Sequence, residues 1–369
     1  MSLSGDKGEL ESWLKLIRCA GLGARPIIAL IERFGSAQAA IDAGSSAWRN
    51  AGASQASIDA LSGIDPGRIE QDIEWCLMPN RGLLTWQDPK FPARLREIGG
   101  CPPALFFRGD PDLLALPQMA VVGSRTATPQ GLETAEGFSA ELSRRGLTIT
   151  SGLALGVDAA AHRGALMAKG QTIAVCATGL DRVYPARHKA LAEEIDRSGL
   201  LISEFAPGTA PRAEHFPRRN RLISGLALGV LVVEAARNSG SLITARLAAE
   251  QGRDVFAIPG SIHNVMARGC HQLIRNGAKL VESVDDILEE IGSQVGQWLR
   301  TAPPVETAAA SSEHRYQNIL DALGDDPQGI DVLAQKTGFA VDVLSAALLE
   351  LELEGRIAPA AGGRVMRLA

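Results

Sequence analysis

Short apolar segments that alternate with helical stretches constrain the fold of this 369-residue chain more than any other feature. The segments read MAVVGS, LTIT, QTIAVCA, LLIS, GVLVVEA, DVFAIPG and AKLVE. Such short, almost uninterrupted apolar strands are typical of a parallel sheet whose two faces are both covered. The stretches between them, such as GLETAEGFSAELSRRG, are long enough to be crossover helices. The pattern therefore predicts a doubly wound α/β domain over residues 118–295.

The residues before this domain show a different pattern. Residues 1–80 have apolar side chains at helical spacing, which predicts a small helical domain. Gly21 and Gly23 interrupt two amphipathic stretches of it. The interruption is either a helix-hairpin-helix turn, which would offer N–H groups to a DNA phosphate, or a plain connection between helices.

Three further segments complete the predicted organisation. Residues 81–117 are rich in Pro and Gly and predict an irregular connector with a short strand at 104–107. Residues 296–312 lack periodicity and predict a linker. Residues 313–369 predict three helices followed by two short strands, which is the pattern of a winged helix.

The heptapeptide SGLALGV occurs twice, at residues 151–157 and 224–230. The first copy follows a predicted strand and precedes a predicted helix, where glycines and free N–H groups favour a bound phosphate. The second copy precedes a strand, so Gly225 and Gly229 are expected to end a helix. Because the flanking residues do not align, we reject an internal duplication and predict a phosphate loop at the first copy only.

Other strand ends carry polar and cationic residues. Gly123, Ser124 and Arg125 follow the first strand, and a guanidinium there can bind phosphate through two hydrogen bonds. Residues 238–241 form a predicted strand-to-helix turn, and residues 175–188 add a threonine, a tyrosine and an arginine. Each turn alone has an ordinary structural explanation. Together they predict one site, because the carboxyl ends of parallel strands meet at one edge of the sheet.

The strongest charge feature is AEHFPRRNRLISG, in which Arg218, Arg219 and Arg221 stand close to Phe216. The chain has a formal net charge of -5, so overall composition does not explain this cluster. One interpretation is a solvated start of a helix. The other is a grip for a phosphate backbone, with a ring on which an unpaired base could stack.

Several classes of protein are disfavoured by what the sequence lacks. It has no phosphate-binding GxxxxGK[ST], no GxGxxG after the first strand, no GxSxG and no HExxH. The five cysteines are scattered without a CxxC pair, which argues against disulfides and zinc. His162 is expected on the surface or in a structural role. We therefore predict no catalytic residue, no metal and no cofactor.

No apolar run approaches the ~18 residues that a membrane span needs, and the first residues, MSLSGDKGELESW, do not resemble a signal peptide. The sequence therefore predicts a cytoplasmic protein without membrane contact.

The motifs VVGSR, SGLALGVDAAAH, TGLDRVYP, SEFAPGTAP, HFPRRNRLISGLALGVLVVEA, SGSLITARLAAEQGRDVFAIPG and LIRNGAKLVE follow one another over residues 120–282. In this order they resemble the DNA-processing family DprA, also called Smf. The resemblance implies a Rossmann-like core with a helical, SAM-like N-terminal domain and a C-terminal winged helix. It further implies a non-enzymatic protein that binds single-stranded DNA in natural transformation, forms a homodimer through the Rossmann-like domain and helps to load the recombinase RecA.

The resemblance also implies a set of DNA-binding residues, and all of them coincide with the strand-end turns and the arginine cluster described above. They are Ser124, Arg125, Ser151, Gly152, Phe216, Arg218, Arg219, Asn220, Arg221, Ser239, Gly240 and Ser241, and the strand end adds Gly123 to the predicted site. Two positions depart from the family pattern, where His188 and His271 each replace an asparagine. Histidine can still donate a hydrogen bond, so the departures affect only local contacts.

Two other functions are weighed against this one. A nucleotide-phosphate hydrolase of the lysine-decarboxylase-like (LOG) group would carry PGGxGTxxE, whereas this chain reads NSGSLITARLAAE. A duplex-DNA regulator would use the third helix of the winged helix, AVDVLSAALLELELEG. That helix carries only acidic charges, at Asp342, Glu350, Glu352 and Glu354, so DNA would repel it. A structural or protein-binding role is therefore expected for the winged helix.

Overall fold

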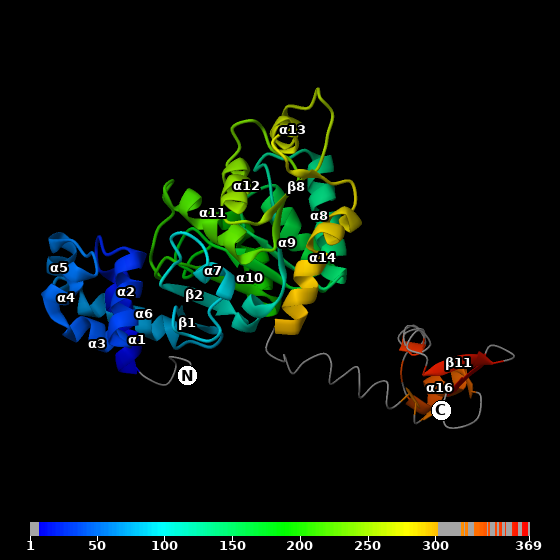
Figure 1. Ribbon diagram of the computed structural model, residues 1–369, viewed down its shortest axis with the longest axis horizontal. Coiled ribbons are helices and arrows are strands. Elements are labelled where there is room, and N and C mark those ends of the chain that lie inside the picture. The colour runs from blue at the N-terminus through cyan, green and yellow to red at the C-terminus, as the bar shows by residue number, and fades with distance from the viewer. Residues whose placement is uncertain are drawn as a thin grey trace. The chain divides into compact units, whose positions relative to one another are not determined.

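The computed structural model describes one continuous part of the chain and several short pieces near its end (Figure 1). The described residues are 7–301, 319–320, 322–323, 328–337, 339, 344, 347–348, 351, 356–360 and 364–367. They belong to two units, 1–300 and 301–369, each with its own internal contacts. The linker predicted over residues 296–312 begins too early, because residues 296–301 continue the helix Val284–Thr301; residues 302–312 lie outside the described residues. None of the helices in the described part of the chain is long and apolar enough to cross a membrane.

The described part of the first unit is built on a nine-stranded sheet with the order β1-β2-β6-β5-β4-β3-β7-β8-β9. The strands are β1 Arg81–Thr85, β2 Ala104–Gly109, β3 Gln118–Val122, β4 Thr148–Ser151, β5 Thr172–Val175, β6 Leu200–Ser203, β7 Gly229–Val232, β8 Asp254–Ala257 and β9 Lys279–Leu280. The seven strands predicted from the apolar segments are β3 to β9, and they pair in parallel. The prediction of a doubly wound sheet is confirmed.

The segment predicted as an irregular connector, residues 81–117, contributes more than one short strand. Its strand β1 pairs antiparallel with β2, and β2 pairs antiparallel with β6, so both strands extend the parallel sheet. The prediction missed β1 because this five-residue strand is buried at four successive positions and shows no alternation. Pairing with β2 supplies the backbone hydrogen bonds of β1, and pairing with β6 joins β2 to the parallel sheet.

Helices cover both faces of the sheet. They are α7 Ala93–Arg96, α8 Pro129–Arg144, α9 Val157–Met167, α10 Lys189–Ser198, α11 His215–Leu226, α12 Ser241–Glu250, α13 Arg268–Arg275 and α14 Val284–Thr301. Along β3, Met119 and Val121 share a core with α8, α9 and α14, whereas Ala120 and Val122 share a core with α11 and α12. Burial on both faces explains why the strands read as uninterrupted apolar runs.

The N-terminal helices pack against the antiparallel end of the sheet (Figure 1). They are α1 Lys7–Arg18, α2 Ala24–Phe34, α3 Ala37–Asp42, α4 Gly44–Asn50, α5 Gln55–Leu61 and α6 Pro66–Cys76. Gly21, with a φ of 73°, lies in the turn between α1 and α2. Arg18 pairs with the buried Asp72, and both Arg18 and Arg68 donate hydrogen bonds to the carbonyl oxygen of Pro207. These contacts tie the helical domain to the loop that precedes α11.

The two copies of SGLALGV lie in opposite contexts, as predicted. The first copy connects β4 to α9. In the second copy, Gly225 lies in the last turn of α11, whereas Gly229 is the first residue of β7. The expectation that Gly229 also ends a helix was therefore wrong. A Cβ at Gly229 would lie 2.7 Å from the ring of Phe256, so the close approach of β7 and β8 explains this glycine.

The second unit combines helices with a three-stranded antiparallel sheet of order β10-β12-β11. Its elements include β10 Gln328–Gly329, α16 Ile330–Thr337, β11 Ile357–Ala360 and β12 Arg364–Arg367. Leu333, Leu344 and Leu351 belong to one apolar core with Ile357. The arrangement agrees with the predicted winged helix. The acidic residues Asp342, Glu350, Glu352 and Glu354 lie outside the described residues.

His162 is buried in α9 and has a structural role. Its Nδ1 lies 2.7 Å from the Thr172 hydroxyl, which itself donates to the carbonyl oxygen of Ile149. Nδ1 must therefore carry the proton in this contact, and Nε2 has no partner among the described residues. Burial lowers the pKa of His162 to about 3 from an ordinary value of 6.5.

This lowered pKa predicts a loss of stability in acid. The unfolded chain binds a proton at His162 below pH 6.5 but the folded chain does not until about pH 3, so stability falls across this window. Between pH 7 and pH 5 the loss amounts to about 2 kcal/mol. Urea unfolding at both pH values should show His162→Asn losing about 2 kcal/mol less than the unchanged chain. Equal pH dependence of the two proteins would contradict the assignment.

Candidate nucleic-acid interface

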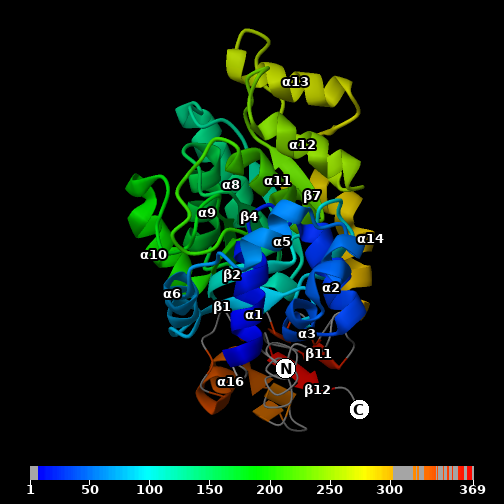
Figure 2. The same ribbon diagram turned by 90° about the vertical axis from the view of Figure 1, so that its left-hand side faces the viewer.

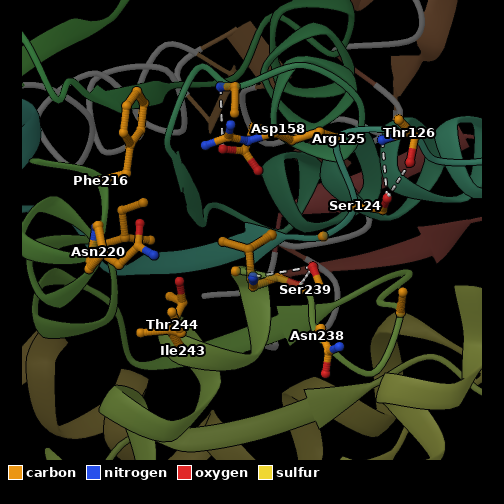
Figure 3. Close-up of a pocket in the computed structure, with 18 of the residues that line it drawn as sticks. Ser124, Arg125, Thr126, Asp158, Phe216, Asn220, Asn238, Ser239, Ile243 and Thr244 are labelled. Carbon is orange, nitrogen blue, oxygen red and sulfur yellow. Dashed lines mark hydrogen bonds between the residues drawn. The ribbon is translucent and has the colours of Figure 1, made fainter. Parts of the chain in front are cut away.

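A cleft opens at the topological switch point of the parallel sheet, where the strands that follow β3 are placed on opposite sides of it. Strand β3 pairs with β4 on one side and with β7 on the other, so the turns after β3 and β7 diverge at their carboxyl ends. The cleft has a volume of about 470 Å³ (Figure 3). It is lined by most of the predicted site residues, namely Gly123, Ser124, Arg125, Phe216, Arg219, Asn220, Ser239, Gly240 and Ser241. Ser151, Gly152, Arg218 and Arg221 are absent from its lining.

The cleft has two polar walls. Figure 3 shows Phe216 and Asn220, from α11, on one wall, with Asn238 and Ser239 across from them. The hydroxyls of Ser239 and Ser241 lie 2.7 Å apart at the start of α12. The N-cap of this helix, Gly240, makes no side-chain capping bond. The backbone N–H of Ser241 donates to the Ser239 hydroxyl, so the groups that line the cleft on the α12 side are the hydroxyls of Ser239 and Ser241 and the amide of Asn238.

Arg125 supplies an exposed cation at the cleft. Its guanidinium carbon lies 5.0 Å from the centre of the Phe216 ring, which is a cation–π contact. Among the ion pairs of the described residues, none involves Arg125. Its charge is therefore available to an anionic ligand.

Arg219 supplies a second cation, which is buried. Only 4% of the residue is exposed, and its Nη1 donates to the carbonyl oxygen of Val175 over 2.7 Å. Its Nε has no partner within the described part of the chain. Burial lowers the pKa of Arg219, and the charge of the neighbouring Asp158 opposes this shift. A Cβ at Gly152 would lie 1.8 Å from Nη1 of Arg219, so this glycine makes room for the guanidinium.

The backbone of the first SGLALGV copy already binds an internal anion. Asp158, in the first turn of α9, accepts hydrogen bonds from the N–H groups of Gly152 and Ala154, at 3.1 and 3.3 Å. Burial raises the pKa of Asp158, whereas the charge of Arg219 and the two N–H groups lower it. Ser151 is also engaged, because its hydroxyl donates to the carbonyl oxygen of Val121. These two amides, expected to be free for a phosphate, thus hold a carboxylate of the chain itself.

The arginine cluster is divided between two environments. Arg218 and Arg221 both pair with the same carboxylate oxygen of Glu204, whose side chain is only 2% exposed. Arg219, between them in sequence, points to the cleft side of the helix and lines the cleft. Sequence reasoning missed Glu204, although its place directly after the strand LLIS was a signal.

Glu234 is another acid that sequence reasoning missed. Its carboxylate accepts hydrogen bonds from the backbone N–H and the hydroxyl of Thr128, at 2.9 and 2.8 Å. Its carbonyl oxygen accepts from the N–H of Ser124. Because Thr128 is the N-cap of α8, the chain's own carboxylate occupies the place where dinucleotide-binding folds hold a phosphate.

Known protein families match successive parts of the chain. The family described as DNA recombination-mediator protein A matches residues 82–292, which is more than half of the chain. The chain belongs to this DprA family. A DprA-like N-terminal HHH domain matches residues 7–65, which agrees with a helix-hairpin-helix turn at Gly21 and Gly23, and a DprA winged helix domain matches residues 302–363.

Individual DprA relatives resemble the chain over most of its length. Protein Smf of Escherichia coli is 40% identical over 97% of this chain and 96% of its own. The DNA processing protein DprA of Streptococcus pneumoniae is 51% identical over 62% of this chain and 78% of its own.

Solved DprA structures share the fold. The X-ray structure of the Streptococcus pneumoniae protein, at 38% identity, has a TM-score of 0.68 and covers 76% of this chain and 97% of that one. A Helicobacter pylori DNA processing protein A, described for its single-stranded DNA binding mode, is 30% identical with a TM-score of 0.52. It covers 57% of this chain and 96% of its own.

Proposed function

We propose that this DprA family member binds single-stranded DNA in the cleft between the β3 and β7 turns. The observation that carries the proposal is the exposed Arg125 over the Phe216 ring, without an ion pair among the described residues, and the buried Arg219 that lines the same cleft. Cations beside aromatic rings are how proteins hold single strands without reading their sequence. The described binding mode of the Helicobacter pylori relative supports this choice of ligand.

We further propose that the protein acts as a binder and has no catalytic activity of its own. The lining of the cleft includes one carboxylate, Asp158, and contains neither histidine nor cysteine among the described residues. Asp158 is held by two backbone N–H groups, which leaves it poorly placed as a general base. A hydrolase of the LOG type would release bases from nucleoside monophosphates, and an assay for free base separates the two functions.

The proposal includes a homodimer that passes coated strands to RecA during natural transformation. Ile262, in the loop before α13, and Val265, at the start of the short helical turn Val265–Ala267, are 75% and 54% exposed. Both views place α13 at an extremity of the first unit, away from the N-terminal helices (Figures 1 and 2). Exposed apolar residues there suit a contact with a second copy. Light scattering tests the dimer, and assembly of RecA on coated strands tests the loading.

The DNA-binding proposal predicts a defined effect of Arg125→Ala. Fluorescence anisotropy with labelled oligo-dT and the matching duplex, at several salt concentrations, should show that the unchanged chain prefers the single strand. The variant should bind oligo-dT about tenfold more weakly, because a charge-assisted contact is lost. In a plot of the logarithm of the binding constant against the logarithm of the salt concentration, the slope for the variant should be less steep by about one unit.

The matched control is Arg144→Ala. Arg144 lies in the last turn of α8, far along the helix from the cleft, and is also exposed. The substitution Arg144→Ala removes the same charge as Arg125→Ala but leaves the residues of the cleft unchanged. Equal losses in the two variants, or no preference of the unchanged chain for the single strand, would overturn the proposed function.

A further inference from the structure

We propose that a second subsite beside the cleft binds a nucleobase, with Tyr184 as its stacking platform. This inference rests on the proposed function and deepens it. A smaller hollow, of about 50 Å³, shares Arg125, Ala154 and Phe216 with the cleft. Tyr184 and Pro185 line its other side. A strand whose phosphate binds Arg125 therefore has one nucleotide in the cleft and the next at the hollow.

The aromatic groups form a row that leads from the cleft to Tyr184. The ring centres of Phe216 and Tyr184 are 5.7 Å apart, and their planes are tilted by 56°. Phe216 is only partly exposed and already carries the guanidinium of Arg125 over its ring. Tyr184 is 46% exposed. Of these two rings, Tyr184 therefore has more surface left for an incoming base, and Phe216 packs beside it.

The segment that carries Tyr184 is anchored to the first SGLALGV copy. Pro185 leads into a short helical turn, Ala186–His188. The ring of His188 is buried, and its Nδ1 lies 2.9 Å from the carbonyl oxygen of Leu153. Because this contact holds the segment in place, Tyr184 loses little conformational freedom when a base stacks on it. His188 is one of the two departures from the family pattern, and it still makes a hydrogen bond here.

Charge alone does not explain an exposed tyrosine at this place. A track that held only phosphates would need cations and N–H donors beside Arg125, whereas the hollow is lined by Leu155, Ala177 and two aromatic rings. An apolar, aromatic surface next to a cation suits a base whose phosphate is bound close by. The two kinds of contact make different predictions for a strand without bases.

The test compares Tyr184→Ala, Tyr184→Phe and Arg125→Ala on oligo-dT and on an abasic strand of equal length. We expect Tyr184→Ala to weaken oligo-dT binding about tenfold, because stacking is lost, and to change binding of the abasic strand less than about twofold. Tyr184→Phe keeps the ring and should bind both strands like the unchanged chain. Arg125→Ala should weaken both.

Photocrosslinking gives a second readout that does not depend on a substitution. An oligonucleotide containing 5-bromodeoxyuridine should crosslink the unchanged, full-length chain at Tyr184, as mapped by mass spectrometry. Crosslinks at Phe216 alone would overturn the subsite, as would equal losses of Tyr184→Ala on the two strands. Failure of the unchanged chain to bind oligo-dT would instead overturn the proposed function, and the subsite with it.

Discussion

Replacing Gly156 with alanine is expected to cost about 2 to 6 kcal/mol of folding free energy and to weaken single-strand binding at least about tenfold. Gly156 precedes α9 with a φ of 76° and a ψ of -128°, which disfavours any side chain. An added Cβ would lie 2.1 Å from the carbonyl oxygen of Ser124 and 2.9 Å from the carbonyl carbon of Arg125. These are backbone atoms, so relief requires a shift of the turn that holds Arg125 at the proposed DNA site.

The control for this substitution is Gly137→Ala in α8. Gly137 is exposed, has no positive φ, and a Cβ there would meet nothing within 4 Å. Alanine should stabilise the helix by up to about 1 kcal/mol and leave DNA binding unchanged. Urea unfolding and anisotropy measure the two effects on both variants. If Gly156→Ala behaved like Gly137→Ala, the close approach of the two turns would not matter to stability or binding.

Glu204→Ala is expected to cost about 3 to 5 kcal/mol, because it leaves a buried arginine without its carboxylate. The side chain of Arg221 is only 15% exposed, and its Nη1 already has no partner among the described residues. Arg218 is affected less, because 57% of its side chain remains in contact with water. Since both arginines belong to α11, their release should also displace Phe216 and weaken DNA binding.

A double variant separates the loss of a pair from the loss of one partner. Replacing Glu204 and Arg221 together with methionine removes both charges and keeps much of the buried volume. We expect it to recover most of the stability lost in Glu204→Ala, as measured by urea unfolding. If instead Glu204→Ala unfolds within about 1 kcal/mol of the unchanged chain, then water or another group solvates Arg221 and the pair is not a structural requirement.

Much of the fold follows from local sequence patterns. Residues 119–122 are apolar at every position because helices cover both faces of β3, and this shows in the sequence without knowledge of any partner. The same pattern of apolar segments shows which parts of the chain form the parallel strands. It also places Arg125 and residues 239–241 at strand ends, which is sufficient to predict that they meet at one edge.

The state of each charged side chain in the site did not follow from such patterns. Arg218 and Arg221 look like free cations in HFPRRNRL, but both pair with the single carboxylate of Glu204, from 14 and 17 positions away. The free amides expected at Gly152 and Ala154 are bound by Asp158. Whether a polar group is available to a ligand depends on neighbours that the folded chain brings to within about 3 Å.

By itself, the sequence determined the seven parallel strands, the helices between them and the edge of the sheet that carries the site, because periodicity and glycine turns are properties of neighbouring residues. Only the tertiary structure added β1 and β2 to the sheet and placed Tyr184 beside Phe216. It alone decided that Arg221 is buried against Glu204, that Arg218 shares the same carboxylate, and that Arg125 lies over the Phe216 ring. Strand pairing, burial and ring stacking bring together residues that are distant along the chain. Local sequence patterns do not predict which of these residues will be in contact.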